Sequence, residues 1–130
     1  MKGNILKQNK GFTFVESLVA LLIFSIVMIG FNALLTTVIK NNFLNKKITT
    51  ATALVRDKIE DLKSKGYTSS DLSSGSHSDS NNPINEIGTN GGIFTRNWNV
   101  VEASSMKNVT VTVSWDSGKH NVSLTAKVIQ

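Results

Sequence analysis

An apolar stretch near the start of the chain constrains the fold more than any other feature of the sequence. From Phe12 to Ile39 the only ionisable side chain is Glu16. The part from Ser17 to Ile39 is long enough to cross a hydrocarbon core of ~30 Å, for which an α-helix needs ~20 residues. A secretory signal has a shorter apolar region followed by a small-residue cleavage site, and the stretch KNNFLNKK that follows here offers no such site. We therefore expect a membrane-spanning helix.

The residues before this stretch are short, polar and cationic. Lys2, Lys7 and Lys10 are three of the fourteen basic residues, and no acidic residue accompanies them. Such a flank favours the cytoplasmic side of a membrane, although lysines also follow the apolar stretch and weaken that orientation. The formal net charge of +5 falls to 11 − 9 = +2 if the first eleven residues are removed. The basic character therefore belongs mostly to the N-terminal segment, and no nucleic-acid partner is expected.

The pattern beyond Ile39 changes from uniformly apolar to amphipathic, and neither glycine nor proline interrupts it before Gly66. Apolar residues at spacings of three and four place one face toward a core, as in a surface helix. This stripe contains Leu44, Ile48, Ala51, Val55, Ile59 and Leu62. The spacing predicts one helix over 12–65, in which 12–39 is the membrane or filament core and 40–65 is amphipathic.

The region 66–92 is rich in serine, asparagine and glycine and is interpreted as a loop. Leu72, Ile84 and Ile87 are the apolar residues that could anchor it. Asp71, His77 and Asp79 could gather round a cation, but a loop of this composition collects such residues by default. We expect no metal site and no cofactor.

Strand signals fill the region 93–130. Val109, Val111, Val113 and Trp115 alternate with polar residues, as expected for a strand with one buried face. A second alternating run starts at His120, beyond a predicted turn at 116–119, and an earlier strand is indicated over 93–103. The residues expected on the inward face of that strand are Phe94, Trp98 and Val100. These features predict an α+β fold, in which about three antiparallel strands pack against the C-terminal half of the helix.

Catalytic groupings are scarce in this sequence. The chain has no cysteine, which excludes thiol nucleophiles, thiolate metal sites and disulfides. Its two histidines, His77 and His120, show no convincing spacing for a Ser-His-acid triad or a metal site. Trp98 and Trp115 are expected in the core rather than on a binding surface. We do not expect an enzyme.

The residues Gly11-Phe12-Thr13-Phe14-Val15-Glu16, placed after a lysine-bearing leader and before a long apolar run, resemble the prepilin signal of the type IV pilin superfamily. The resemblance implies that residues 1–11 are a leader peptide and that cleavage occurs between Gly11 and Phe12. Phe12 would then carry the N-methyl group. Glu16 would pair with the α-amine of a mature N-terminus during assembly, since a carboxylate in an apolar environment needs a partner.

Within the superfamily, the apolar segment and the C-terminal 38 residues resemble the PilV-type minor pilins, or pilus modification proteins. The helix-kinking proline of many major pilins would fall at Ala33, which also favours a minor subunit. The resemblance implies a precursor in the bacterial inner membrane, processing by prepilin peptidase/N-methyltransferase, and assembly with other pilins on an inner-membrane platform into a surface pilus. Adhesion and motility are the activities of such pili.

Three alternatives stay open at this point. The chain could be a minor pseudopilin of a type II secretion system, whose N-terminal segment is nearly indistinguishable. It could instead be a pilin that displays an adhesive or DNA-binding head, with the region 66–92 as the discriminating feature. A plain membrane anchor is the third possibility.

Overall fold

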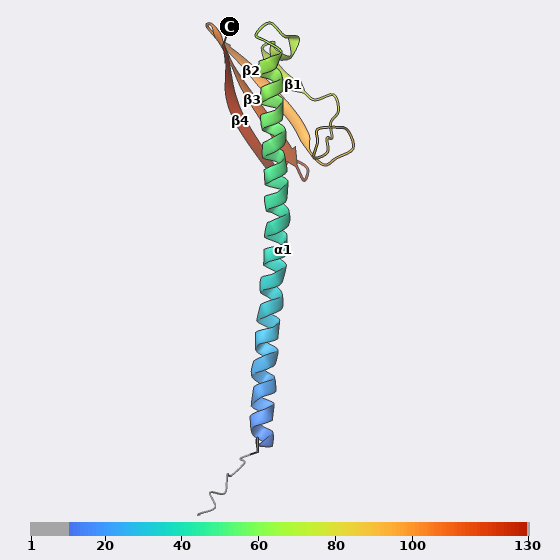
Figure 1. Ribbon diagram of the computed structural model, residues 1–130, viewed down its shortest axis with the longest axis vertical. Coiled ribbons are helices and arrows are strands. Elements are labelled where there is room, and N and C mark those ends of the chain that lie inside the picture. The colour runs from blue at the N-terminus through green and yellow to red at the C-terminus, as the bar shows by residue number, and fades with distance from the viewer. Residues whose placement is uncertain (1–10, 130) are drawn as a thin grey trace, which may run out of the picture. The chain divides into compact units, whose positions relative to one another are not determined.

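The computed structural model describes residues 11–129, so residues 1–10 of the predicted leader lie outside the described part. The chain divides into two compact units, Met1–Asn42 and Phe43–Gln130. We call residues 43–129 the head. The elements in chain order are α1 (Phe14–Ser64), the 3₁₀ helix η1 (Ser70–Leu72), β1 (Gly75–Ser78), β2 (Thr95–Ala103), β3 (Met106–Trp115) and β4 (His120–Ile129) (Figure 1).

The head contains a four-stranded antiparallel sheet in the order β1-β2-β3-β4. The predicted α+β fold, a long N-terminal helix on an antiparallel sheet, is confirmed. The expected strand count of about three is wrong by one, because β1 lies inside the region interpreted as a loop. Its sequence, GSHS, has no alternation of apolar and polar residues. It is a strand because its backbone pairs with β2, in a register that places Gly75 opposite Val100 and Ser78 opposite Asn97.

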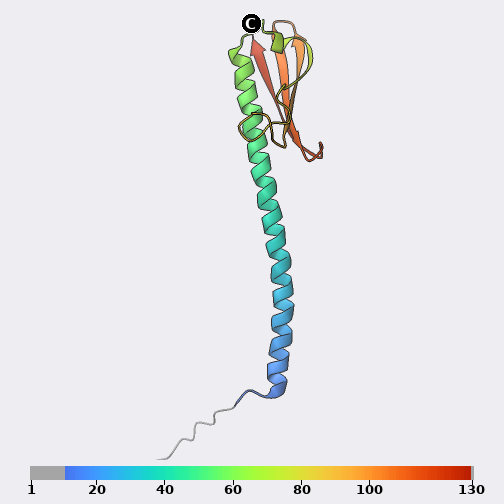
Figure 2. The ribbon, with the colours of Figure 1, turned by 90° about the vertical axis from the view of Figure 1, so that its right-hand side faces the viewer.

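The core of the head lies between the C-terminal half of α1 and one face of the sheet, as Figure 2 shows. The helix contributes Ala51, Leu54, Val55 and Leu62, all buried. The sheet contributes alternate residues of β2 and β3, and both tryptophans are buried there, as predicted. The buried apolar residues of the sheet and of the segment before β2 are Phe94, Trp98, Val100, Val109, Val111, Val113, Trp115 and Val128.

The predicted helix stripe was partly wrong. Ile48 is 40% exposed, whereas Leu54 and Lys58 are buried although neither belonged to the stripe. The predicted spacings agree with the helical period of 3.6 residues, so the error is one of extent: the buried residues of α1 begin only at Ala51, and Ile48 lies before them. Lys58 is tolerated in this position because its Nζ lies 4.3 Å from the centre of the Trp98 ring and 3.2 Å from Asp61 Oδ2.

The region 66–92 is fixed to the sheet by backbone and side-chain hydrogen bonds. Ile84 and Phe94 exchange two backbone bonds, of 2.7 and 3.1 Å, and the amide of Asn82 both donates to and accepts from the backbone of Arg96. Leu72 and Ile84 are buried, as the sequence suggested, but Ile87 is 81% exposed and anchors nothing. Hydrogen bonds to the sheet, together with the two buried residues Leu72 and Ile84, therefore order this segment.

The turn between β3 and β4 falls where the sequence predicted it. Asp116, Ser117 and Gly118 have φ values of 52°, 57° and 82°, in the left-handed region that glycine, asparagine and aspartate tolerate best. Lys47 on α1 donates to both carboxylate oxygens of Asp116, at 3.0 and 3.2 Å. The hairpin tip is thereby held against the helix within the head.

Candidate processing and assembly site

Thr13 sets the start of α1. Its hydroxyl oxygen accepts a hydrogen bond of 3.2 Å from the backbone N–H of Glu16, and its carbonyl accepts one of 3.1 Å from Ser17. A threonine followed three residues later by glutamate is the capping-box pattern, in which the side chain satisfies one of the free N–H groups of a helix start. The resemblance to the prepilin signal assigns no role to Thr13, but the capping-box pattern of Thr13 and Glu16 indicates one from the sequence alone.

Gly11 and Phe12 precede the helix and belong to no secondary structure. Both are exposed, and the side chain of Phe12 is among the most accessible apolar groups, at 83%. A Cβ added to Gly11 would meet no atom within 4 Å. The peptide bond predicted to be cleaved therefore lies in accessible, non-helical backbone, which a protease can bind in extended form.

Glu16 lies in the first turn of α1, where the positive end of the helix dipole favours an acidic side chain. Among residues 11–129 its carboxylate has neither an ion-pair nor a hydrogen-bond partner. Gly11, Phe12, Thr13 and Glu16 line one hollow. The structure thus brings the three predicted site residues together with the residue that caps the helix.

The apolar segment that follows is uncovered on every side. All its residues from Val15 to Ile39 are exposed in the single chain, and α1 is the one helix in the described part that is long and apolar enough to cross a membrane. Apart from Glu16, its few polar side chains donate hydrogen bonds to carbonyl groups of the helix backbone, which satisfies them without water. These bonds run from Ser17 to Thr13, from Ser25 to Leu21, from Asn32 to Met28, from Thr36 to Asn32 and from Thr37 to Ala33.

The three residues considered for a cation, Asp71, His77 and Asp79, do not share a site. Asp71 accepts a hydrogen bond of 2.8 Å from Lys65, and Asp79 pairs with Arg96. The His77 ring stacks on Trp98 at 5.4 Å between centres and bonds the Ser73 carbonyl through Nε2. Within residues 11–129, no group of three or more histidine, aspartate or glutamate side chains is placed to hold a metal ion.

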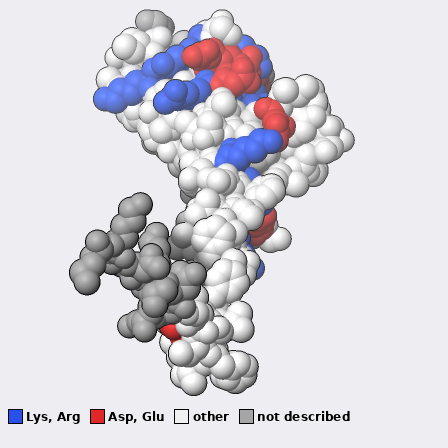
Figure 3. All heavy atoms as spheres, turned by 60° about the horizontal axis from the view of Figure 1, so that its bottom comes forward, with Lys and Arg blue, Asp and Glu red and all other residues white. Residues whose placement is uncertain are grey.

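The ion pairs of the head shift the pKa values of its carboxyl groups. Burial raises the pKa of Asp79, but the hydrogen bonds from Arg96 and from the Asn81 backbone outweigh this effect and leave it below its usual value. The hydrogen bond from Lys65 lowers the pKa of Asp71. In Figure 3, blue and red atoms accordingly lie side by side on the head. These shifts come from structural pairs rather than from a catalytic group.

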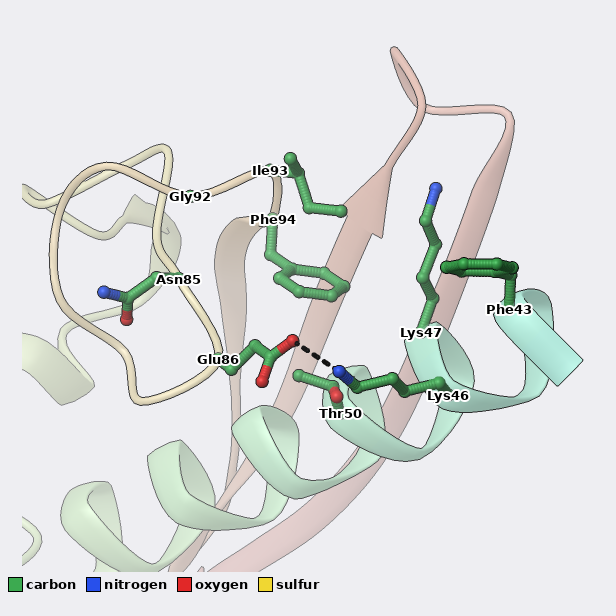
Figure 4. A pocket seen from close by; sticks show the side chains of 9 residues that line it. All are labelled: Phe43, Lys46, Lys47, Thr50, Asn85, Glu86, Gly92, Ile93 and Phe94. Carbon is green, nitrogen blue, oxygen red and sulfur yellow. Dashed lines mark ion pairs between the residues drawn. The ribbon is translucent and has the colours of Figure 1, made fainter.

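An apolar cavity of about 310 Å³ lies between α1 and the segment that leads into β2 (Figure 4). Its lining consists of Phe43, Lys46, Lys47, Thr50, Asn85, Glu86, Gly92, Ile93 and Phe94. Lys46 and Glu86 pair across it at 3.4 Å, and Lys47 pairs with Asp116. This cavity could not be predicted from the sequence, because the residues of its two walls, 43–50 and 85–94, lie far apart along the chain. Each charged side chain of the lining is paired, Lys46 and Glu86 with each other and Lys47 with Asp116 outside the lining, and the exposed surface of the cavity is mainly apolar.

Comparison with protein families gives one match. Residues 6–31 match the model of the prokaryotic N-terminal methylation motif, a range that includes Gly11, Phe12, Glu16 and the first part of the apolar segment. No curated protein and no solved structure matches the chain. The motif supports a type IV pilin or pseudopilin and implies processing by prepilin peptidase and assembly with other pilins. Together with the apolar helix, it is consistent with anchoring of the precursor in the inner membrane.

Proposed function

We propose that the chain is a minor pilin of a type IV pilus, made as an inner-membrane precursor and built into the filament after cleavage between Gly11 and Phe12. One observation carries this proposal: the methylation motif leads directly into the first half of α1, whose apolar side chains as far as Ile39 are all exposed in the single chain. So much apolar surface must be covered, by lipid in the precursor and by neighbouring subunits in a filament.

Glu16 is the assembly residue in this proposal. Cleavage after Gly11 leaves the α-amine of Phe12 four residues before it, so a positive charge becomes available near the carboxylate. A charge in an apolar filament core is costly unless it is paired. A carboxylate that pairs with the α-amine of a neighbouring subunit therefore selects one register of the helices and disfavours the others.

The assignment to a minor rather than a major subunit rests on the helix and the head. α1 continues through Gly30 and Ala33 without a break, so it has no proline kink. The head is small, and the chain has no cysteine with which to form a stabilising disulfide bond. These features are in keeping with the PilV-type resemblance, in which the subunit belongs to a low-copy complex that primes assembly or forms the tip.

A minor pseudopilin of a type II secretion system is the second candidate, because the matched motif is confined to residues 6–31 and both systems use it. Deletion of the gene distinguishes the two candidates. Loss of surface pili with normal protein secretion supports the pilin. Loss of secretion with normal pili supports the pseudopilin and would overturn the pilin assignment.

The role of Glu16 is tested with Glu16→Ala, and Glu60→Ala serves as a matched control from an exposed position on the same helix. We expect Glu16→Ala to be cleaved normally and to accumulate in the membrane, with incorporation into sheared pili reduced about tenfold or more. The reason is that the filament then contains an unpaired α-amine. Glu60→Ala should be incorporated normally. Equal incorporation of both variants would contradict the registry role.

A further inference from the structure

The outer face of the sheet carries an ordered set of neutral polar side chains. Because Trp98, Val100, Val109, Val111 and Val113 point toward α1, the residues between them point away from it. The strand register aligns these outer residues in three rows across the sheet. The rows are Thr95-Ser114-Asn121, Ser78-Asn97-Thr112-Ser123 and Ser76-Asn99-Thr110-Thr125.

These eleven residues, which we call the polar grid, contain only serine, threonine and asparagine. In the next row the register adds Val101, Asn108 and Lys127, the first charge and the first aliphatic side chain on this face. The helix covers the opposite face, so no helix or strand of the described chain lies over the grid (Figure 2). A neutral surface of this extent differs from the rest of the head, where charged pairs are frequent.

The grid is rich in groups that can both donate and accept hydrogen bonds. Hydroxyls do both, and each asparagine amide offers two donors and a carbonyl. Three pairs bond across strands: Thr110 with Thr125 and Thr112 with Ser123, both at 2.9 Å, and Ser76 with Asn99 at 3.2 Å. Strand geometry repeats the groups about every 4.8 Å across the sheet and about every 6.7 Å along it.

A shallow, open depression of about 530 Å³ lies within the grid. It is lined by Ser76, Ser78, Asn97, Asn99, Thr110 and Thr112, together with the paired residues His77 and Trp98. Six of the eleven grid residues therefore line one shallow depression on β1, β2 and β3. An open surface of this kind can be contacted by an extended ligand that lies across several strands.

The chemistry of the grid excludes several kinds of partner. Nucleic acid and anionic lipid surfaces are bound by lysine and arginine, and the grid has neither. Protein interfaces are built round buried aromatic, aliphatic or arginine anchors, which the grid also lacks. What remains is an uncharged ligand that presents many hydroxyl or amide groups at short repeats.

We propose that the polar grid binds a neutral polysaccharide, with the sugar hydroxyls exchanging hydrogen bonds with the serine, threonine and asparagine side chains of β1 to β4. Each exposed hydrogen bond adds little, so a single short chain should bind weakly, with a Kd on the order of 1 mM. Attachment to an insoluble glycan, which offers many repeats, should be far more persistent. This inference does not depend on pilus assembly.

The test uses the full chain, purified in a zwitterionic detergent without a sugar headgroup, and particles of cellulose and chitin as probes. We expect retention on at least one of them, insensitive to salt. Thr110→Val/Thr112→Val removes two hydroxyls without changing side-chain shape and should lower retention at least fivefold. Thr49→Val on α1, an exposed threonine outside the grid, should leave retention unchanged. A second double variant, Asn97→Ala/Asn99→Ala, repeats the test on the neighbouring strand.

The proposal is overturned if the wild-type chain binds neither particle. It is also overturned if both double variants are retained as strongly as the wild-type chain while circular dichroism shows that their heads are folded. If sedimentation shows a dimer that both double variants lose, the occupant of the grid is a second copy, and the proposal is wrong. Because processing and pilus assembly are not measured here, failure leaves the proposed pilin function intact.

Discussion

Arg96 on β2 and Asp79 form an enclosed ion pair in the head. The guanidinium donates through Nε at 2.9 Å and through Nη2 to the same carboxylate oxygen, Oδ2. The two side chains are only 7% and 8% exposed. A third bond runs from Nη1 of Arg96 to the carbonyl of Leu54 on α1, at 3.3 Å. This one residue therefore ties the region 66–92, the sheet and the helix of the head together.

Removal of the buried partner should destabilise the head strongly. In Asp79→Ala the guanidinium stays buried without its carboxylate, which costs about 3–5 kcal/mol of unfolding free energy. Asp57→Ala is the matched control, since Asp57 lies 3.7 Å from the same guanidinium but is 76% exposed. It should cost no more than about 1 kcal/mol. Urea denaturation followed by tryptophan fluorescence measures both, and equal losses would contradict the structural importance of the buried pair.

The stability of the head should fall as the solution is acidified. Burial raises the pKa of Asp61, Asp71 and Asp79, but the lysines beside Asp61 and Asp71 and the arginine beside Asp79 outweigh it and hold each pKa below its value in the unfolded chain. The stabilisation is complete above the unfolded pKa of about 3.9 and is lost as the pH falls through the lower folded values. Denaturation midpoints between pH 7 and pH 2 test this dependence. A midpoint independent of pH below 4 would refute it.

The two buried tryptophans should respond differently to the same substitution. Trp98 Nε1 donates a hydrogen bond of 2.8 Å to the Asp71 carbonyl, whereas Trp115 Nε1 is buried and has no partner among the described residues. Trp98→Phe breaks a bond and leaves a carbonyl unsatisfied, so it should cost about 1–3 kcal/mol more than Trp115→Phe. Both variants lose similar ring area. Thermal unfolding by circular dichroism compares them, and equal destabilisation would show that the Trp98 bond contributes nothing.

The parts of the fold that the sequence predicted are those with a strong apolar period. The uninterrupted pattern from Phe12 to Lys65 predicted α1, and the alternation round Val111 and Val122 predicted β3 and β4. β1 could not be found in this way, since Ser76 and Ser78 face outward and its pairing is a property of the backbone. The expectation that Ile87 could anchor the region 66–92 was wrong, because an apolar residue in a loop can remain exposed to solvent.

The candidate site was predictable in part for the same reason. The spacing of Gly11, Phe12 and Glu16 is local, so it can be read from the sequence, and the cap at Thr13 is equally local. The burial of Arg96 and Lys58 could not be predicted in this way. Arg96 is buried because the fold places Asp79 beside it, and Lys58 is buried between Asp61 and the ring of Trp98. The polar grid became visible only when the register aligned four strands, each with two or more neutral polar residues at alternate positions.

The central claim is that the chain is a prepilin, and the mass of the mature protein tests it most directly. The protein is extracted from the membranes of a host that has prepilin peptidase, and its intact mass is measured. The account predicts loss of residues 1–11 and the addition of one methyl group, with Phe12 as the new N-terminus. The full-length chain, unmethylated and still beginning at Met1, would contradict it.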